Sequence, residues 1–253
     1  MAEGGFKKPT VAYRSASLSD VSLSGATLNV VTNVDNPNPV TFALTDVDYK
    51  LSIEGRQVAT GKPPEGLEIP ANGNADLTLP AAFKFADLGQ AVNTVLQKGS
   101  AGYRAEGTIG VKTPVGVVRV PLSHEGTFTL PAMPGIALGT PRLTNVAIDH
   151  ATVELPVTLT GKGSLPVPLQ ALEAVVTIGG AHIGEVSAKD LGTLEPGASR
   201  SVTLPLTVPF SGALEAAQAM LKGGAVPIAL DGHLQSGPAP VPFQLKTTAN
   251  FKR

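Results

Sequence analysis

The chain has 253 residues, of which 42% are apolar and 15% charged, and its formal net charge is −1. This composition is sufficient for a buried core and excludes a disordered, charge-rich polymer. The near-neutral balance excludes the basic excess that nucleic-acid binding requires. The absence of cysteine excludes disulfides, thiolate catalysis and cysteine-ligated zinc.

Apolar and polar residues alternate along most of the chain, which predicts half-buried antiparallel strands. The alternation includes Val21, Leu23, Leu28 and Val30, and later Val146, Ile148, Val153, Leu155 and Val157. It is clearest at Val47, Tyr49, Leu51 and Ile53, which lead into Glu54-Gly55, a hairpin-turn signal. Pro80 and Pro205 interrupt later runs and, because proline donates no N–H, they predict edge strands or a bulge.

Two Asn-Pro pairs, Asn36-Pro37 and Asn38-Pro39, follow the first alternating run. A residue before proline is pushed toward an extended conformation, and proline fixes its own φ and gives no N–H to a ladder. Asparagine side chains can bond nearby backbone groups that are left unpaired. We therefore expect a stiff crossing from one sheet to the other, and a ligand-binding role for Asn36 and Asn38 is the alternative.

One helix is predicted in each half, over residues 85–99 and 210–224, with Asp87 and Ser211 as candidate caps. Their apolar faces are Leu88, Val92 and Leu96 in the first helix and Leu214, Ala217 and Leu221 in the second. Packing of each helix on its sheet is the simplest expectation. The alternative is that helix and sheet part to leave an apolar groove with room for an acyl chain.

The chain resembles itself when it is shifted by 125 positions, with no gap over residues 18–107. Aligned pairs include Leu18 with Leu143, Leu23 with Ile148, Gly55 with Gly180, Thr78-Leu79-Pro80 with Thr203-Leu204-Pro205, and Gly107 with Gly232. A fixed offset predicts two copies of one module, residues 10–130 and 136–253, joined by a Pro- and Gly-rich stretch. The predicted fold class is mostly β: two tandem antiparallel β-sandwich modules, each with about seven strands plus one helix.

In the first copy, an Asn-Pro-Asn, a Tyr-x-Leu-x-x-x-Gly hairpin and the strand "IPANGNADLTLP" follow in order. This series resembles the WHy domain of the type 2 late-embryogenesis-abundant proteins. The residues that fit the pattern are Tyr49, Leu51, Gly55, Val58, Gly61, Ile69, Pro70, Gly73, Leu77 and Pro80. In the second copy, Gly161–Ser164 replaces Asn-Pro-Asn-Pro and Ala174 replaces Tyr49, so a role of the asparagine side chains is expected to be weaker or absent there.

The resemblance implies a folded, non-enzymatic β-sandwich associated with water stress, desiccation and hypersensitive responses. Its bacterial members are often exported or lipid-anchored, and relatives have been proposed to hold lipids. We expect a desiccation-protective protein at or near the cell envelope, with client proteins, lipid or a membrane surface as partners. The alternative is a lipid-binding or lipid-transfer envelope protein that uses the apolar groove, and a third interpretation is a scaffold that pairs through exposed sheet edges. A periplasmic or lipid-anchored location is favoured if an export segment was removed, and a cytoplasmic one otherwise.

No catalytic, metal or cofactor site is predicted. The stretch "GRQVATGKPP" misses the P-loop spacing, and neither G-x-S-x-G nor H-E-x-x-H occurs. The histidines, His124, His150, His182 and His233, are not paired at metal-ligand spacing. Asp46 and Asp48 share a strand face, and a solvated surface explains them better than a calcium or acid–base site. We therefore expect no enzyme activity and no cofactor.

Overall fold

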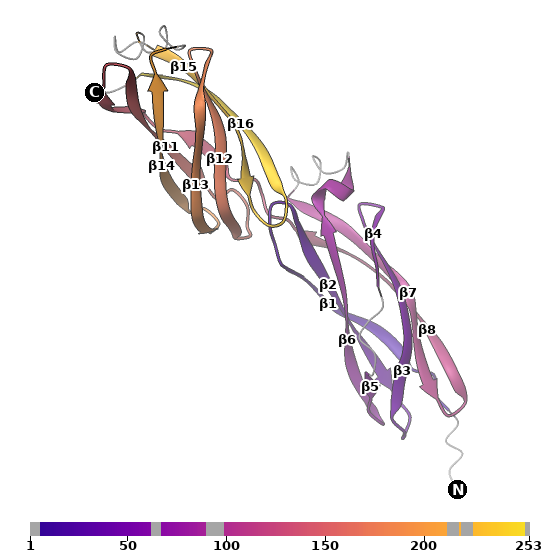
Figure 1. Ribbon diagram of the computed structural model, residues 1–253. Coiled ribbons are helices and arrows are strands. Elements are labelled where there is room, and N and C mark those ends of the chain that lie inside the picture. Colours follow the sequence, from indigo (N-terminus) through magenta and orange to yellow (C-terminus); the bar gives the residue numbers. More distant parts are fainter. Residues whose placement is uncertain (1–5, 62–66, 90–98, 212–217, 219–224, 251–253) are drawn as a thin grey trace. The chain divides into compact units, whose positions relative to one another are not determined.

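The computed structural model describes residues 6–61, 67–89, 99–211, 218 and 225–250. The chain divides into two compact units, one made of Met1–Val21 and Gly25–Leu130, the other of Ser22–Ser24 and Pro131–Arg253. Both units are built from antiparallel sheets (Figure 1), which confirms the predicted fold class. Each unit has its own hydrophobic core.

The first unit is a sandwich of two sheets. Its strands are β1 (Thr10–Ser19), β2 (Gly25–Asn36), β3 (Phe42–Ile53), β4 (Arg56–Gly61), β5 (Glu68–Ile69), β6 (Gly73–Lys84), β7 (Ser100–Thr113) and β8 (Gly116–Thr129). One sheet has the order β1-β2-β6 and the other β4-β3-β7-β8, with β5 beside β3. The core lies between the sheets and takes Leu28 and Val30 from β2 and Leu51 and Ile53 from β3.

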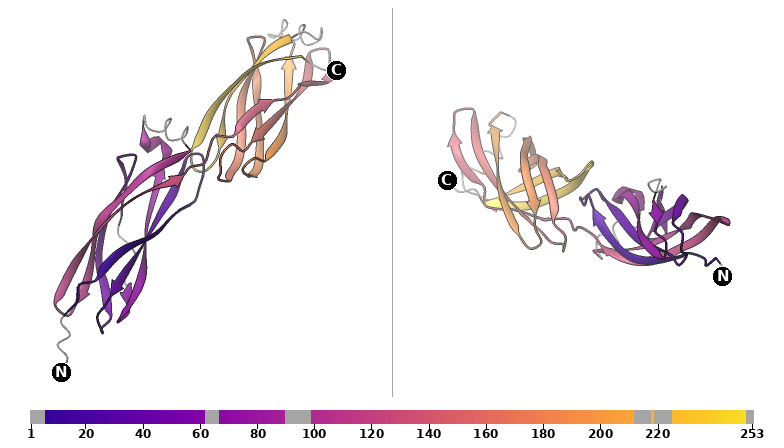
Figure 2. Two further views of the ribbon diagram at one scale, coloured as in Figure 1. Left: turned by 180° about the vertical axis from the view of Figure 1, so that it is seen from behind. Right: turned by 90° about the horizontal axis from the view of Figure 1, so that it is seen from below.

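The second unit repeats this plan. Its strands are β9 (Gly135–Leu138), β10 (Arg142–Val146), β11 (His150–Thr160), β12 (Val167–Ile178), β13 (Ala181–Leu194), β14 (Ser199–Pro209), β15 (Ala225–Gln235) and β16 (Pro240–Asn250). One sheet has the order β10-β11-β14, with β9 beside β11, and the other β13-β12-β15-β16. A shift of 125 residues carries β3 onto β12, from Phe42–Ile53 to Val167–Ile178. Figure 2 shows the layers of each unit from two further sides.

The period-two pattern was a good guide to the buried faces. Val47, Tyr49, Leu51 and Ile53 are all less than 5% exposed, as their alternation predicts. The pattern failed at the turn between β10 and β11, where Val146 is 50% and Ile148 100% exposed. Alternation reports which residues share a face, and it cannot show that a strand ends before the core is reached.

The turn chemistry also agrees with the sequence. Glu54 and Gly55 have φ values of 48° and 76°, and Gly179 and Gly180 have 61° and 85°. Positive φ at both central residues is what a two-residue hairpin turn of type I′ requires. Pro80 and Pro205 lie on β6 and β14, each at the end of its sheet order, so both prolines are on edge strands as predicted.

The predicted helix of each module is not observed as such. In the described residues, the first becomes a 3-10 turn, η1 (Phe85–Leu88), and Gly89 follows it with a φ of 56°. Asp87 lies at the third position of this turn, where its carboxylate accepts a hydrogen bond from the Lys84 N–H at 3.3 Å. The rest of the first helix and almost all of the second lie outside the described residues.

Candidate functional site

The Asn-Pro segment between β2 and β3 forms a buried polar clamp. Asn36 is fully buried and Asn38 is 5% exposed. The Asn36 side-chain amide donates to the carbonyl oxygens of Val40 at 2.8 Å, Pro70 at 3.0 Å and Ile69 at 3.4 Å. Its Oδ1 accepts the Asn38 backbone N–H at 3.1 Å. The side chain thus satisfies a crossing of the chain where the prolines donate nothing.

Asn38 fastens the segment that leads into β1. Its Oδ1 accepts the Lys7 N–H at 2.9 Å, and its Nδ2 donates to the Lys7 carbonyl at 2.7 Å. This pair of bonds imitates a strand pairing with an amide side chain in place of a backbone. Pro37 is half-buried beside it and Pro39 is exposed. With their polar groups turned onto the protein's own backbone, Asn36 and Asn38 have the geometry of structural residues.

Tyr49 connects the two sheets of the first unit. From β3, its hydroxyl donates to the carbonyl oxygen of Pro80 on β6 in the opposite sheet. Burial raises the pKa of the Tyr49 phenol above its usual value. Gly55 lies at the tip of the β3–β4 hairpin, where its positive φ suits glycine. Ala174 occupies the Tyr49 position in the second unit, so this bond between sheets has no counterpart there.

The apolar groove predicted beside the helices is represented by one described residue. Leu88, at the end of η1, is fully buried and belongs to the core of the first unit. The other predicted members, Val92, Leu96, Leu214, Ala217 and Leu221, lie outside the described residues. Leu88 therefore packs as a core residue.

A hollow lies on the solvent-facing side of the larger sheet in each unit. The first, of about 740 Å³, is lined by Asp48, Tyr49, Lys50, Thr60, Glu106, Gly107 and Thr108. The second, of about 570 Å³, is lined by Glu173, Ala174, Val175, Glu185, Val186, Ser187, Lys189, Asp231, Gly232 and His233. A shift of 125 residues carries every residue of the first set onto one of the second.

Gly107 and Gly232 shape these hollows. A Cβ on Gly107 would lie 2.1 Å from the Asp48 carbonyl oxygen, and one on Gly232 would lie 2.1 Å from that of Glu173. Only glycine permits so close an approach of β7 to β3 and of β15 to β12. The sequence contained a signal for this pair, since the two glycines are identical at the fixed offset, but their structural role was missed.

The two hollows differ in charge. The first presents Asp48, Glu106 and Lys50, whereas the second presents three carboxylates, Lys189 and His233. His233 Nε2 lies 3.1 Å from Glu173 Oε2, so this histidine is held by a carboxylate on the neighbouring strand. Within the described part of the chain, no group of histidine, aspartate and glutamate side chains has the geometry of a metal site.

An aromatic cluster bridges the β1 and β8 edges of the first unit. Tyr13 stacks on His124 with ring centroids 3.5 Å apart, and Tyr103 lies 5.9 Å from the same imidazole. Burial raises the pKa of Tyr103, and a hydrogen bond with Tyr13 raises it further. A Cβ on Gly126 would lie 2.7 Å from the Tyr103 ring, so this glycine makes room for the cluster.

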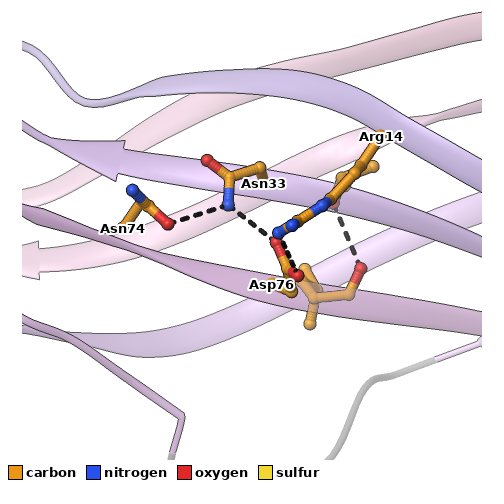
Figure 3. A network of polar contacts seen from close by, with 6 residues as sticks. Arg14, Asn33, Asn74 and Asp76 are labelled. Atoms are coloured by element: carbon orange, nitrogen blue, oxygen red, sulfur yellow. Dashed lines mark hydrogen bonds and ion pairs between the residues drawn. The ribbon is translucent and has the colours of Figure 1, made fainter.

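A polar network crosses the outer face of the β1-β2-β6 sheet (Figure 3). Arg14, at a bulge in β1, reaches over β2 and pairs with Asp76 on β6. Asn33 on β2 donates to Asp76 at 2.7 Å and to Asn74 at 3.2 Å. The hydrogen bond from Arg14 and then the one from Asn33 hold the pKa of Asp76 below its usual value.

Comparisons with known proteins point to one family. A family model described as "Late embryogenesis abundant protein" matches residues 31–126. A relative, the late embryogenesis abundant protein Lea14-A of Gossypium hirsutum, is 24% identical over 131 residues, which cover 51% of this chain and 87% of the relative. These matches support a protein of the LEA type, related to water stress.

Solved structures are similar over about half of the chain. A crystal structure of a protein from Archaeoglobus fulgidus is 15% identical, with 51% of this chain and 100% of that chain covered and a TM-score of 0.35. The solution structure of AT1g01470 from Arabidopsis thaliana is 20% identical, with 53% and 90% covered and a TM-score of 0.44. TM-scores this low add nothing to the fold, which rests on the sheets described above.

Proposed function

We propose that this chain is a non-enzymatic protein of the WHy class of type 2 late-embryogenesis-abundant proteins, and that it protects other molecules during water loss. The observation that carries the proposal is the family match over residues 31–126. That segment holds the clamp of Asn36 and Asn38 and the β3–β4 hairpin with Tyr49 and Gly55. The residues that carry the resemblance are thus the ones that fix the chain path of the first unit.

We extend the proposal to the second half of the chain as a tandem duplication, with copies at residues 10–130 and 136–253. Strand order and the placement of the two hollows support it, since both are shared at one offset. The second copy lacks the asparagine clamp, because Gly161 and Gly163 stand at the positions of Asn36 and Asn38. The copies therefore share an architecture and differ in their fine polar structure.

The mechanism we propose acts at the surface of the folded chain. The net charge of −1 leaves no strong field to select partners of one sign. Every buried polar side-chain atom among the described residues has a hydrogen-bond partner, so the folded state has no internal demand for water there. Such a fold can remain intact and contact client proteins or a membrane surface as water is withdrawn.

Lipid carriage at a bacterial envelope is the alternative proposal. It rests on the predicted groove, to which the described residues contribute the buried Leu88. No helix in the described part of the chain is long and apolar enough to cross a membrane. Native mass spectrometry of protein isolated separately from host membranes and from the soluble fraction tests both envelope location and lipid carriage. A stoichiometric lipid adduct would favour the carrier, and a bare mass would favour the protective function.

Drying in the presence of a sensitive enzyme tests the leading proposal. The enzyme is dried and rehydrated with increasing amounts of this chain, and its residual activity is compared with that in an unrelated β-sandwich protein of similar size and charge. We expect more activity to survive with this chain at every mass ratio. Equal survival with both proteins would reduce the effect to crowding and would contradict the proposal.

A further inference from the structure

Two turns at equivalent positions of the repeat have opposite environments. The β1–β2 turn contains Leu23, and the offset of 125 aligns it with Ile148 in the β10–β11 turn. Leu23 counts as part of the second unit, where it is 7% exposed and belongs to the core. Its N–H donates to Ser236 Oγ at 3.0 Å, and Ser24 Oγ donates to the Ser236 carbonyl at 3.1 Å.

The counterpart turn presents its apolar residue to solvent. Ile148 is 100% exposed and Val146 is 50% exposed. The turn itself is well held, since Ala147 N–H donates to the His150 carbonyl at 2.9 Å and Phe210 N–H donates to the Asp149 carbonyl at 2.8 Å. We call residues 146–149 the isoleucine turn. It presents a bulky apolar side chain on an ordered support, which is the form of a docking element.

The element that receives Leu23 also has a counterpart. Ser236 lies in the turn between β15 and β16, and the equivalent turn of the first unit joins β7 and β8. There Val115 is 69% and Val117 52% exposed. Thr113 holds this turn, because its hydroxyl donates to the Gly116 carbonyl at 2.7 Å. We call residues 114–117 the valine turn.

The two turns are complementary in charge as well as in apolarity. Asp149 follows Ile148, and its side chain is 84% exposed. Lys112 is exposed and pairs directly with Val117 across the β7–β8 hairpin. A contact between isoleucine and valine turns would thus bury apolar side chains with a carboxylate and an ammonium close by.

We propose that the isoleucine turn of one copy of this chain docks on the valine turn of a second copy. The contact repeats between copies the pairing of equivalent elements that holds Leu23 beside Ser236 in the second unit. It joins two different surfaces, so each bound copy still offers one unused turn of each kind at its ends. Association therefore proceeds head to tail and grows with concentration.

Sedimentation velocity over a wide range of concentrations tests this with two variants of the full chain, Ile148→Ser and Val117→Asp. Both positions are exposed, so both variants are expected to unfold at the same denaturant concentration as the wild type, which circular dichroism checks. The wild type is expected to gain mass with concentration, and each variant alone to remain a single chain. An equimolar mixture is expected to form pairs and nothing larger, because one intact turn of each kind remains.

Three results would overturn the proposal. A wild type that stays a single chain at every concentration would show that the turns do not associate. An Ile148→Ser variant that associates like the wild type would place the contact elsewhere. A mixture that stays monomeric while the wild type associates would show that the turns do not dock on one another.

Discussion

Asn36 and Asn38 show how buried amides can replace strand pairing where prolines interrupt a chain. One side chain donates to three carbonyl oxygens, and the other pairs with both polar groups of Lys7. Neither donor can be supplied by Pro37 or Pro39, which have no N–H. The glycines of the second copy reach the same crossing through backbone freedom, without a polar side chain.

Asn36→Asp tests the clamp. It replaces the donating amide by a carboxylate that faces three carbonyl oxygens in a fully buried position. A buried charge without donors should lower the free energy of unfolding of the first unit by about 3 kcal/mol or more. Urea denaturation measures it. Asn29→Asp is the matched control, because Asn29 is half-buried on the same strand and bonds a hydroxyl, Ser19 Oγ at 2.9 Å, that can donate to a carboxylate. Equal losses in both variants would contradict the role of the clamp.

Gly107→Ala and Gly232→Ala test the close approach of strands at the hollows. Because each Cβ would lie 2.1 Å from a carbonyl oxygen, the backbone must shift, and we expect each variant to lose about 1–3 kcal/mol of stability. Gly184→Ala is the control: it lies in strand β13, and its nearest heavy atom would be 3.8 Å away. Denaturant midpoints compare the three. A loss at Gly184 as large as at the other two would assign the effect to strand glycines in general.

At the scale of elements, the β1-β2-β6 sheet is fastened across its outer face by Arg14, Asn33 and Asp76. The Asp76 carboxylate receives bonds from both neighbours, which hold its pKa below the usual value. A carboxyl group with a depressed pKa stabilises the fold above its unfolded pKa, and the contribution is lost as pH falls through the folded value. Because the group is exposed, solvent limits the size of this contribution.

Asp76→Asn tests this network through pH. The variant should unfold at a lower urea concentration than the wild type near neutral pH, since the charged partner of Arg14 is gone. The difference should shrink in acid, where the wild-type carboxyl is itself protonated. Asp35→Asn, on β2 of the same sheet, controls for the loss of one negative charge. A difference between wild type and Asp76→Asn that is constant with pH would contradict the assignment.

The elements that sequence could predict were those set by local chemistry. Alternation at Val47–Ile53 located the buried face of β3, and Glu54-Gly55 and Gly179-Gly180 located hairpin turns, because both signals depend on near neighbours. The signal failed where distant contacts decide. Leu23 and Ile148 are similar in sequence, yet one is buried and the other fully exposed, since only tertiary structure determines what covers a turn. The first predicted helix became a 3-10 turn at Phe85–Leu88, although its apolar spacing is helical.

The candidate sites were predicted unevenly. The bonds of Asn36 and Asn38 were expected in kind, because the residues beside a proline lack backbone partners. The hollows were not expected, because they arise from the approach of β7 to β3 and of β15 to β12, which are far apart in the chain. The glycines that permit the approach could be seen only as an identity between the two halves.

At the scale of the whole molecule, two cores predict two unfolding events. Each unit has its own hydrophobic cluster, so calorimetry of the full chain should resolve two transitions. Gly107→Ala should lower the transition of the first unit and Gly232→Ala that of the second. A single transition that both variants lower equally would show that the units unfold as one.

The most direct test of the account compares a folded and an unfolded form of the same composition in the drying experiment. The double variant Gly107→Val, Gly232→Val forces side chains into both close approaches, and circular dichroism verifies that its sheets are lost before it is used. The measurement is the residual activity of a drying-sensitive enzyme after rehydration with wild type or double variant at equal mass. The account predicts that protection requires the folded wild type. Equal protection by the unfolded variant would contradict it and assign the effect to composition alone.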